Sequence, residues 1–114
     1  LMAITDSTLS NKQAVNGRGG KNLFGMYHAP EFIWADTRFV LTEDVAAIRG
    51  ALVETVKNGL IAGDEELLGE MSARLDAIVA KDPEAVEWAA RRSVESKLVI
   101  LRRDPTERGY TMCL

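Results

Sequence analysis

The sequence predicts a mainly α-helical protein: a small three-helix body, a long irregular N-terminal arm and a short C-terminal tail. From Leu41 onward, apolar residues recur at spacings of three and four, as on one face of a helix. Before that point the chain has no hydrophobic period and is rich in glycine, asparagine and serine. The predicted domains are therefore an arm of residues 1–40 and a helical domain of residues 41–114.

The predicted arm has two parts. Residues 1–22 are rich in turn formers, and Asn16-Gly17 is a strong turn signal, but the flanking residues alternate too poorly to predict a hairpin. Residues 23–40 hold all three phenylalanines, one of two tryptophans and one of two tyrosines. Because aromatic side chains bury large areas and anchor contacts, we expect this part to form an interface. The expected interface residues are Phe24, Met26, Tyr27, Phe32, Trp34 and Phe39.

The first helix is predicted over about residues 42–62. Thr42 is a suitable N-cap and is followed by two acidic residues, which the helix dipole favours in a first turn. Residues 38–41 can form a short strand before it. Gly59 or Gly63 is expected to end the helix. Its apolar stripe comprises Val45, Ile48, Leu52, Val56 and Leu60.

The second and third helices are predicted over about 64–81 and 83–102. Asp64 is the expected N-cap of the second, with two glutamates in its first turn. Asp82-Pro83 ends it and starts the third, because aspartate caps well and proline is tolerated at the first helical position. The expected apolar stripe of the third helix is Val86, Ala89, Ala90, Val94, Leu98 and Leu101.

The end of the third helix has two interpretations. Residues 98–101 can continue the helix, or they can form a strand that turns at residues 104–109 and returns over 110–114. We favour the helix, since Leu98 and Leu101 extend the apolar stripe.

Charge is distributed unevenly along the chain. Residues 42–87 carry four basic and eleven acidic side chains, whereas residues 88–114 carry six basic and three acidic ones. With residues 1–41 at +1, the net charge is −3. Such bipolarity favours contact between copies of the chain or within a larger protein assembly, although ordinary solvated helix faces give a similar pattern.

Composition excludes several classes of protein. The single cysteine, Cys113, cannot form an internal disulfide, which fits a reducing compartment. No apolar run approaches the roughly 18 residues of a membrane span, and no signal peptide is evident. We therefore expect no membrane partner, and a location in the cytoplasm or in a virion.

Four arginines form the second candidate contact site. They are Arg91, Arg92, Arg102 and Arg103. The two pairs are eleven residues apart, about three helical turns, so a continuous third helix places them on one face. Such a face can meet phosphates or the acids of another chain. The acidic overall composition argues against a dedicated nucleic-acid-binding protein.

Motifs for chemistry are weak. The glycine-rich loop at residues 17–22 fits neither a P-loop nor a dinucleotide-binding pattern, because Val15 and Asn22 stand where those motifs need other residues. His28 is the only histidine, and Glu65, Glu66 and Glu70 cluster where a helix start attracts acids. We predict no cofactor and no metal.

The favoured function is a non-enzymatic structural or assembly subunit, as in a virus-like particle or scaffold, which packs through its aromatic arm and charged helices. One alternative is a regulatory module that binds nucleic acid through the arginines of the third helix. The other is a small enzyme, or an accessory subunit of one, using His28 and the glutamates of the second helix.

Overall fold

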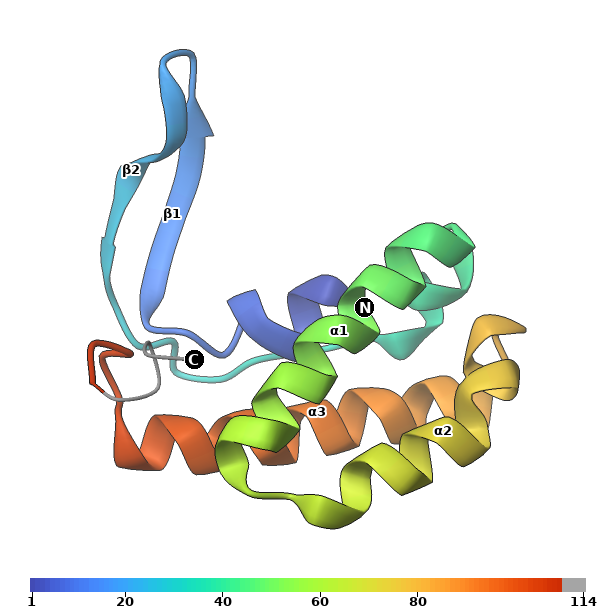
Figure 1. Ribbon diagram of the computed structural model, residues 1–114. Helices are drawn as coiled ribbons and strands as arrows, with labels where there is room; N and C mark the ends of the chain where they lie inside the picture. The colour runs from blue at the N-terminus through green and yellow to red at the C-terminus, as the bar shows by residue number, and fades with distance from the viewer. Residues whose placement is uncertain (110–114) are drawn as a thin grey trace.

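Three helices form the body of the protein. The computed structural model describes residues 1–109, and its helices are α1 (Val45–Ala62), α2 (Glu65–Val79) and α3 (Pro83–Arg103). The long α3 packs against both α1 and α2 (Figure 1). The predicted mainly α class is thus confirmed.

Local signals fix most of the helix ends where the sequence predicts them. Gly63 follows α1 in the left-handed region, with φ of 77°, and the Asp64 carboxylate accepts a hydrogen bond from the Leu67 amide at 3.2 Å. Asp82 caps α3 in the same way, accepting from the Ala85 amide at 2.9 Å. The turns between the three helices are therefore tight.

The start of α1 differs from its prediction. Thr42 is not the N-cap; it ends a 3-10 helix, η2 (Thr37–Thr42), which replaces the expected short strand. Asp36 starts η2 by accepting a hydrogen bond from the Arg38 amide at 3.0 Å, and Asp44 caps α1 by accepting from the Ala47 amide at 2.7 Å. An aspartate N-cap competes well with threonine, so α1 begins at Val45.

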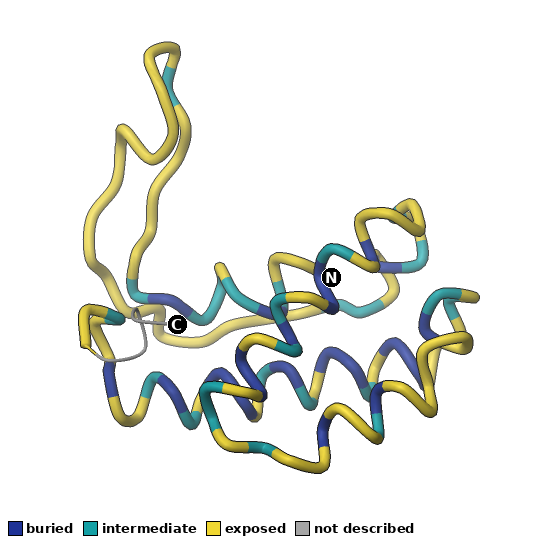
Figure 2. Tube along the Cα trace, viewed as in Figure 1, coloured by how far each residue is buried: buried dark blue, intermediate teal, exposed yellow. Residues whose placement is uncertain are grey.

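The core lies between the facing sides of the helices (Figure 2). Val40 of η2 closes one end of it and is 2% exposed. The buried residues contributed by the three helices include Ile48, Leu52, Met71, Ile78, Val86 and Ala89.

The arm is more regular than its sequence predicts. A short π-helix, η1 (Ala3–Ser7), packs against α1 and α3, and strands β1 (Lys12–Gly17) and β2 (Gly20–Tyr27) form an antiparallel hairpin. The hairpin register shifts between Val15 and Gly17, and the chain reverses at residues 18–19, not at Asn16-Gly17. Asn16 instead accepts a hydrogen bond from the Asn22 amide at 3.1 Å, which steadies the loop.

The hairpin projects away from the helices, and nearly all of its residues are exposed (Figures 1 and 2). The radius of gyration is 14.5 Å, above the roughly 13 Å of a compact domain of about 100 residues. The projecting hairpin accounts for that excess.

The helical interpretation of residues 98–101 is confirmed, since α3 runs to Arg103. The alternative return strand at 110–114 and Cys113 lie outside the described residues. No helix within residues 1–109 is long and apolar enough to cross a membrane.

Candidate functional site

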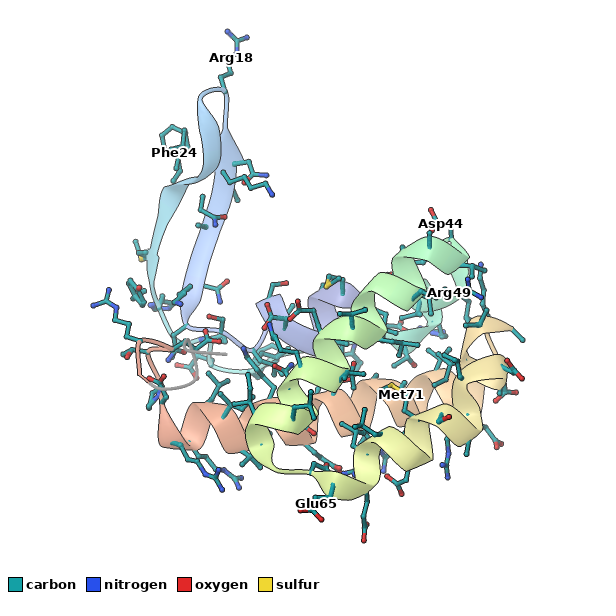
Figure 3. The ribbon with its side chains drawn as sticks, in the orientation of Figure 1. Arg18, Phe24, Asp44, Arg49, Glu65 and Met71 are labelled. Carbon is teal, nitrogen blue, oxygen red and sulfur yellow. The ribbon has the colours of Figure 1, made fainter. Side chains whose placement is uncertain are left out.

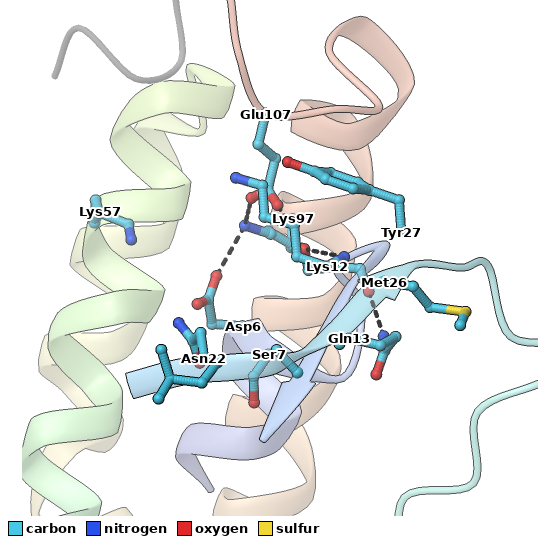
Figure 4. Close-up of a pocket in the computed structure, with 14 residues that line it drawn as sticks. Asp6, Ser7, Lys12, Gln13, Asn22, Met26, Tyr27, Lys57, Lys97 and Glu107 are labelled. Atoms are coloured by element: carbon cyan, nitrogen blue, oxygen red, sulfur yellow. Dashed lines mark hydrogen bonds and ion pairs between the residues drawn. The ribbon is translucent and has the colours of Figure 1, made fainter. Parts of the chain in front are cut away.

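An open pocket of about 630 Å³ lies where the hairpin, η1, α1 and the end of α3 meet (Figure 4). It collects charged side chains that are far apart in the sequence. The charged and polar residues that line it include Asp6, Lys12, Asn22, Tyr27, Lys57, Lys97 and Glu107. Three lysines and two carboxylates therefore share one site.

Lys97 is the central group of the pocket. Its side chain is 5% exposed, and its ammonium donates to Asp6 Oδ1 at 2.8 Å and to Glu107 Oε1. Glu107 Oε2 accepts a further hydrogen bond from Ser10 Oγ at 2.7 Å. A buried ammonium with two carboxylate partners ties η1 and the turn after α3 to the helix.

These contacts shift two pKa values. Burial alone would lower the pKa of Lys97, but the hydrogen bonds that its ammonium donates to Asp6 and Glu107, together with their negative charges, outweigh burial, and the pKa of Lys97 is raised. Burial would likewise raise the pKa of Glu107, yet the bonds to Lys97 and Ser10 and the charges of Lys97 and Lys12 lower it. Both groups are therefore ionised near neutral pH.

Lys12 and Lys57 supply the other two positive charges. Lys12 begins β1 and pairs with Tyr27 across the hairpin, and its ammonium forms no hydrogen bond or ion pair within residues 1–109. Lys57 lies on α1 and is paired with Glu54 one turn earlier. Lys12 is thus the pocket cation most available to an anion.

Small polar residues let the supporting elements approach one another. Thr55 of α1 and Ser93 of α3 are fully buried, and their hydroxyl oxygens are 2.6 Å apart. Asn58 Nδ2 of α1 donates to the Thr5 carbonyl at 3.1 Å, which anchors η1 and places Asp6 beside Lys97. The α1–α3 crossing and η1 together position the site.

The turn after α3 is held by Asp104. Its carboxylate accepts hydrogen bonds from the Arg108 amide at 3.2 Å and the Gly109 amide at 2.8 Å. Arg108 then donates to the Tyr27 hydroxyl at 3.0 Å, with its guanidinium 5.1 Å from the centre of the Tyr27 ring. This contact joins the base of the hairpin to the end of α3 at the rim of the pocket.

The predicted aromatic interface residues are mostly exposed. Trp34 is 85% exposed, Phe32 79%, Phe39 73%, Met26 69% and Phe24 66%. Met26 and Tyr27 also line the pocket. Their role as an interface stays a prediction.

The predicted arginine face is divided in the structure. Arg91 pairs with Glu87 of its own helix at 2.6 Å, whereas Arg92 reaches across to Asp64 at 3.0 Å and Glu70 at 3.1 Å. Arg102 and Arg103 form no ion pair within residues 1–109 and lie in the last turn of α3. A contact through these arginines stays a prediction.

The residues named for a small enzyme do not meet in the pocket. His28 follows β2, is exposed, and uses its backbone amide to bond the Asn11 carbonyl at 2.9 Å. Glu65 and Glu66 lie in the first turn of α2, and neither they nor Glu70 line the pocket. In the described part of the chain, no group of three or more His, Cys, Asp or Glu side chains is placed to hold a metal ion.

Sequence reasoning missed the lysines of the pocket. Lys97 lies within a helix expected to bury Val94 and Leu98, but the helix buries Lys97 instead and leaves Leu98 37% exposed. A charged residue is expected at the surface unless partners for it are evident. The two partners of Lys97 are 91 and 10 residues away, so the sequence alone did not reveal that Lys97 is buried. A polar Ser-x-x-Ser-Lys run on the inward face was the available signal.

Comparisons with known proteins point to an enzyme. A family model described as the N-terminal region of 3-dehydroquinate synthase matches residues 1–50. The 3-dehydroquinate synthase of Xylella fastidiosa (strain M12) is 36% identical over 114 residues, which is 100% of this chain and 30% of that protein.

Two further relatives carry the same name. The 3-dehydroquinate synthase of Xanthomonas campestris pv. campestris (strain 8004) is 38% identical over 109 residues, 96% of this chain and 29% of that protein. That of Sulfolobus acidocaldarius is 32% identical over 107 residues, 94% of this chain and 30% of that protein. This chain thus spans about 30% of the length of these curated relatives. No solved structure gives a significant match.

The prediction of a non-enzymatic structural or assembly protein is therefore wrong. The relatives are named as enzymes, and the similarity runs along nearly the whole chain. The alternative of a small enzyme, or an accessory subunit of one, agrees better with these relatives. The aromatic residues suggested an assembly protein because a segment that packs on another surface is rich in apolar residues, whatever the function of that surface. Composition therefore did not distinguish an assembly subunit from an enzyme.

Proposed function

We propose that this chain forms part of the substrate-binding site of an enzyme that makes 3-dehydroquinate, at the pocket around Lys97. The observation that carries this proposal is the convergence of Lys12, Lys57 and Lys97 on one pocket, in a chain similar along its length to 3-dehydroquinate synthases. The activity itself is proposed for the complete enzyme, of which such a chain covers about 30%.

The charge of the pocket suits an anionic substrate. The product, 3-dehydroquinate, is a carboxylate at neutral pH, and we expect the substrate from which it forms to carry the same carboxylate. Three lysines and two carboxylates leave the lining with one positive charge. Since Lys97 is engaged by Asp6 and Glu107, Lys12 is the cation we assign to the substrate carboxylate.

The neighbouring groups can orient the rest of the substrate. The Asn22 amide and the Tyr27 hydroxyl line the same pocket and suit hydroxyl or carbonyl groups. Lys97, held by Asp6 and Glu107 and charged near neutral pH, then provides a positive potential that stabilises a developing negative charge.

The test is a chimera in which this chain replaces the corresponding segment of the Xylella fastidiosa enzyme. We expect the chimera to form 3-dehydroquinate, measured by mass spectrometry. Lys12→Met should raise KM at least about tenfold, the loss of one charge-assisted hydrogen bond. Lys97→Met should lower kcat by about 100-fold or more.

Lys21→Met is the matched control. Lys21 lies on the same hairpin but not in the pocket, so its replacement should leave both constants unchanged. A folded chimera that forms no 3-dehydroquinate would overturn the proposed function. An active chimera insensitive to Lys12→Met and Lys97→Met would overturn the assignment of the pocket.

A further inference from the structure

Asn58 is a buried amide that joins two elements of the pocket. It lies on α1 directly after Lys57 and is 1% exposed. Its Nδ2 donates to the Thr5 carbonyl of η1 at 3.1 Å, across 53 residues of sequence. Within residues 1–109 no other hydrogen bond links α1 to η1. This one bond is therefore the directional contact between the two elements.

η1 has little of its own to hold it in place. It is a π-helix of five residues, a rare form that occurs mostly as single turns. Met2, at its N-cap position, makes no side-chain cap. Ile4 packs partly on the helical core, but apolar contacts have no direction. A bond from a neighbouring helix is therefore needed to fix how η1 is oriented.

The bonded carbonyl belongs to the peptide group that leads into Asp6. Because a peptide group is planar, holding the Thr5 carbonyl also fixes the backbone nitrogen of Asp6 and the direction in which its side chain leaves. Asp6 Oδ1 lies 2.8 Å from Lys97 Nζ (Figure 4). The bond from Asn58 therefore helps to hold the Asp6 carboxylate on the ammonium.

Of the two carboxylates on Lys97, Asp6 is the one more easily lost. Its side chain is 37% exposed, against 13% for Glu107. Glu107 also accepts a hydrogen bond from Ser10 at 2.7 Å, whereas the Asp6 carboxylate has no second partner within residues 1–109. An exposed carboxylate can exchange a single partner for water. The place of Asp6 on Lys97 thus depends on the backbone that carries it.

The other atom of the amide argues against a purely structural role for Asn58. Its Oδ1 is buried and accepts no hydrogen bond within residues 1–109. A buried acceptor without a donor loses its hydration uncompensated, which offsets the gain from the bond at Nδ2. A leucine of similar size would therefore serve the stability of the fold about as well. What the asparagine adds is the position of η1.

We propose that Asn58 is a positioning residue of the pocket, whose bond to Thr5 keeps the Asp6 carboxylate on the Lys97 ammonium. This contact is a matter of geometry and does not depend on the reaction. Its effect on catalysis rests on the proposed function, in which Lys97 stabilises a developing negative charge.

Four charged groups surround Lys97 in the pocket. Asp6 comes from η1, Glu107 from the turn after α3, Lys12 from β1 and Lys57 from α1. Without Asp6, the ammonium of Lys97 keeps one carboxylate partner and shares the pocket with two other cations. Since Asp6 helps to raise the pKa of Lys97, its loss lowers that pKa. The ammonium then gives up its protons to water more readily.

Nuclear magnetic resonance of the lysine ammonium groups tests the geometry in the 114-residue chain. The ammonium protons of Lys97 should exchange slowly with water, because the side chain is 5% exposed and bonds to two carboxylates. In Asn58→Leu we expect this exchange to be at least about tenfold faster, as on loss of one charge-assisted hydrogen bond. Asp6→Asn should give the same increase. The melting temperature of Asn58→Leu should stay within about 5 °C of that of the unchanged chain.

Two further variants make the comparison specific. Asn58→Ala also removes the bond to Thr5, but it leaves space where leucine adds apolar bulk, and it should speed the exchange equally. Ser96→Ala is the matched control. Ser96 is 2% exposed and directly precedes Lys97, but its hydroxyl lies 3.5 Å from Asp64, which does not line the pocket. Its replacement should leave the exchange of the Lys97 protons unchanged.

The chimera with the Xylella fastidiosa enzyme tests the effect on catalysis. Asn58→Leu should lower kcat about tenfold and leave KM nearly unchanged, because Lys97 is misplaced while Lys12 still binds the substrate. The alkaline limb of the kcat–pH profile should move to lower pH. In the Asp6→Asn background, Asn58→Leu should lower kcat no further, since both changes remove the same contact.

Four outcomes overturn the positioning role. One is exchange of the Lys97 protons in Asn58→Leu that equals that of the unchanged chain. Another is faster exchange in Asn58→Leu but not in Asn58→Ala, because the bulk of leucine is then the cause. The third is a melting temperature that falls by more than about 10 °C in both variants, which would make the bond a support of the whole fold. The fourth is multiplication of the effects of Asn58→Leu and Asp6→Asn on kcat.

The positioning role and the proposed function fail separately. A folded, inactive chimera, together with faster exchange in Asn58→Leu, overturns the function and supports the positioning. An active chimera, together with exchange of the Lys97 protons that Asn58→Leu leaves unchanged, overturns the positioning and leaves the function standing.

Discussion

At the scale of single residues, Lys97 shows how a buried charge organises a site. Its ammonium is nearly inaccessible, yet Asp6 and Glu107 keep it charged. Removing one member of such a group leaves the others buried and poorly paired, which costs more than the group contributes as a whole. Lys97 therefore combines a structural and an electrostatic role.

The Lys97–Glu107 pair makes stability depend on pH. The pKa of Glu107 is lowered from its ordinary 4.5, so its contribution is present above that value and is lost as pH falls through the folded-state pKa. The pKa of Lys97 is raised from 10.5, so its contribution is present below that value and is lost only in stronger alkali. The pair is intact between these limits.

We expect Glu107→Gln to destabilise the protein by about 1–3 kcal/mol at pH 7 and to flatten the loss of stability as the pH falls below 4.5. Urea unfolding at several pH values measures both effects. Glu31→Gln, at an exposed position, is the control. An acid-side slope equal to that of the unchanged protein would show that Glu107 is not the titrating group.

At the scale of elements, the helices were predictable and the hairpin was not. The Asp64 cap, the Gly63 stop and the Asp82-Pro83 boundary act within a few residues, so the sequence alone reveals them. The hairpin lacks a buried face, so alternation of apolar and polar residues, the usual strand signal, is missing.

The contact between α1 and α2 depends on a missing side chain. A Cβ at Gly59 would lie 2.5 Å from Leu67 Cδ2, and Leu67 is fully buried. Gly59→Ala should therefore destabilise the protein by about 1–3 kcal/mol. Gly69→Ala, on an exposed face of α2 with nothing within 4 Å, should stabilise it by up to about 1 kcal/mol. Urea unfolding of both variants gives the comparison, and equal stability would contradict the packing argument.

At the scale of the whole molecule, the acidic and basic stretches form ion pairs with each other within one chain. Asp64 and Glu70, from the acidic stretch, form ion pairs with Arg92 from the basic stretch.

The pocket could not be predicted from the sequence, because its charged residues come from distant parts of the chain. The charged side chains of the pocket come together only after η1 has packed on α3, and no regular spacing in the sequence predicts this. They are Asp6, Lys12, Lys57, Lys97 and Glu107.

The hairpin and the helical body should respond to mutation separately. A Cβ at Gly25 would lie 2.1 Å from the Gln13 carbonyl oxygen, so Gly25→Ala must disturb the strand pairing. We expect the melting temperature of the helices to change by less than about 3 °C, while the amides of β1 and β2 exchange faster. Gly19→Ala, whose Cβ would meet only ordinary contact at 3.6 Å, is the control. A large drop in melting temperature would show that hairpin and body unfold together.

The tip of the hairpin has a consequence for how such chains vary. Arg18 stands at the far end of the projecting ribbon, distant from every core contact (Figure 3). Residues added or removed at positions 18–19 lengthen or shorten a surface loop without displacing Lys12, Lys57 or Lys97 of the pocket, because tolerance to insertion concentrates at exposed loop tips. The tip is therefore also the natural position for a reporter or affinity tag.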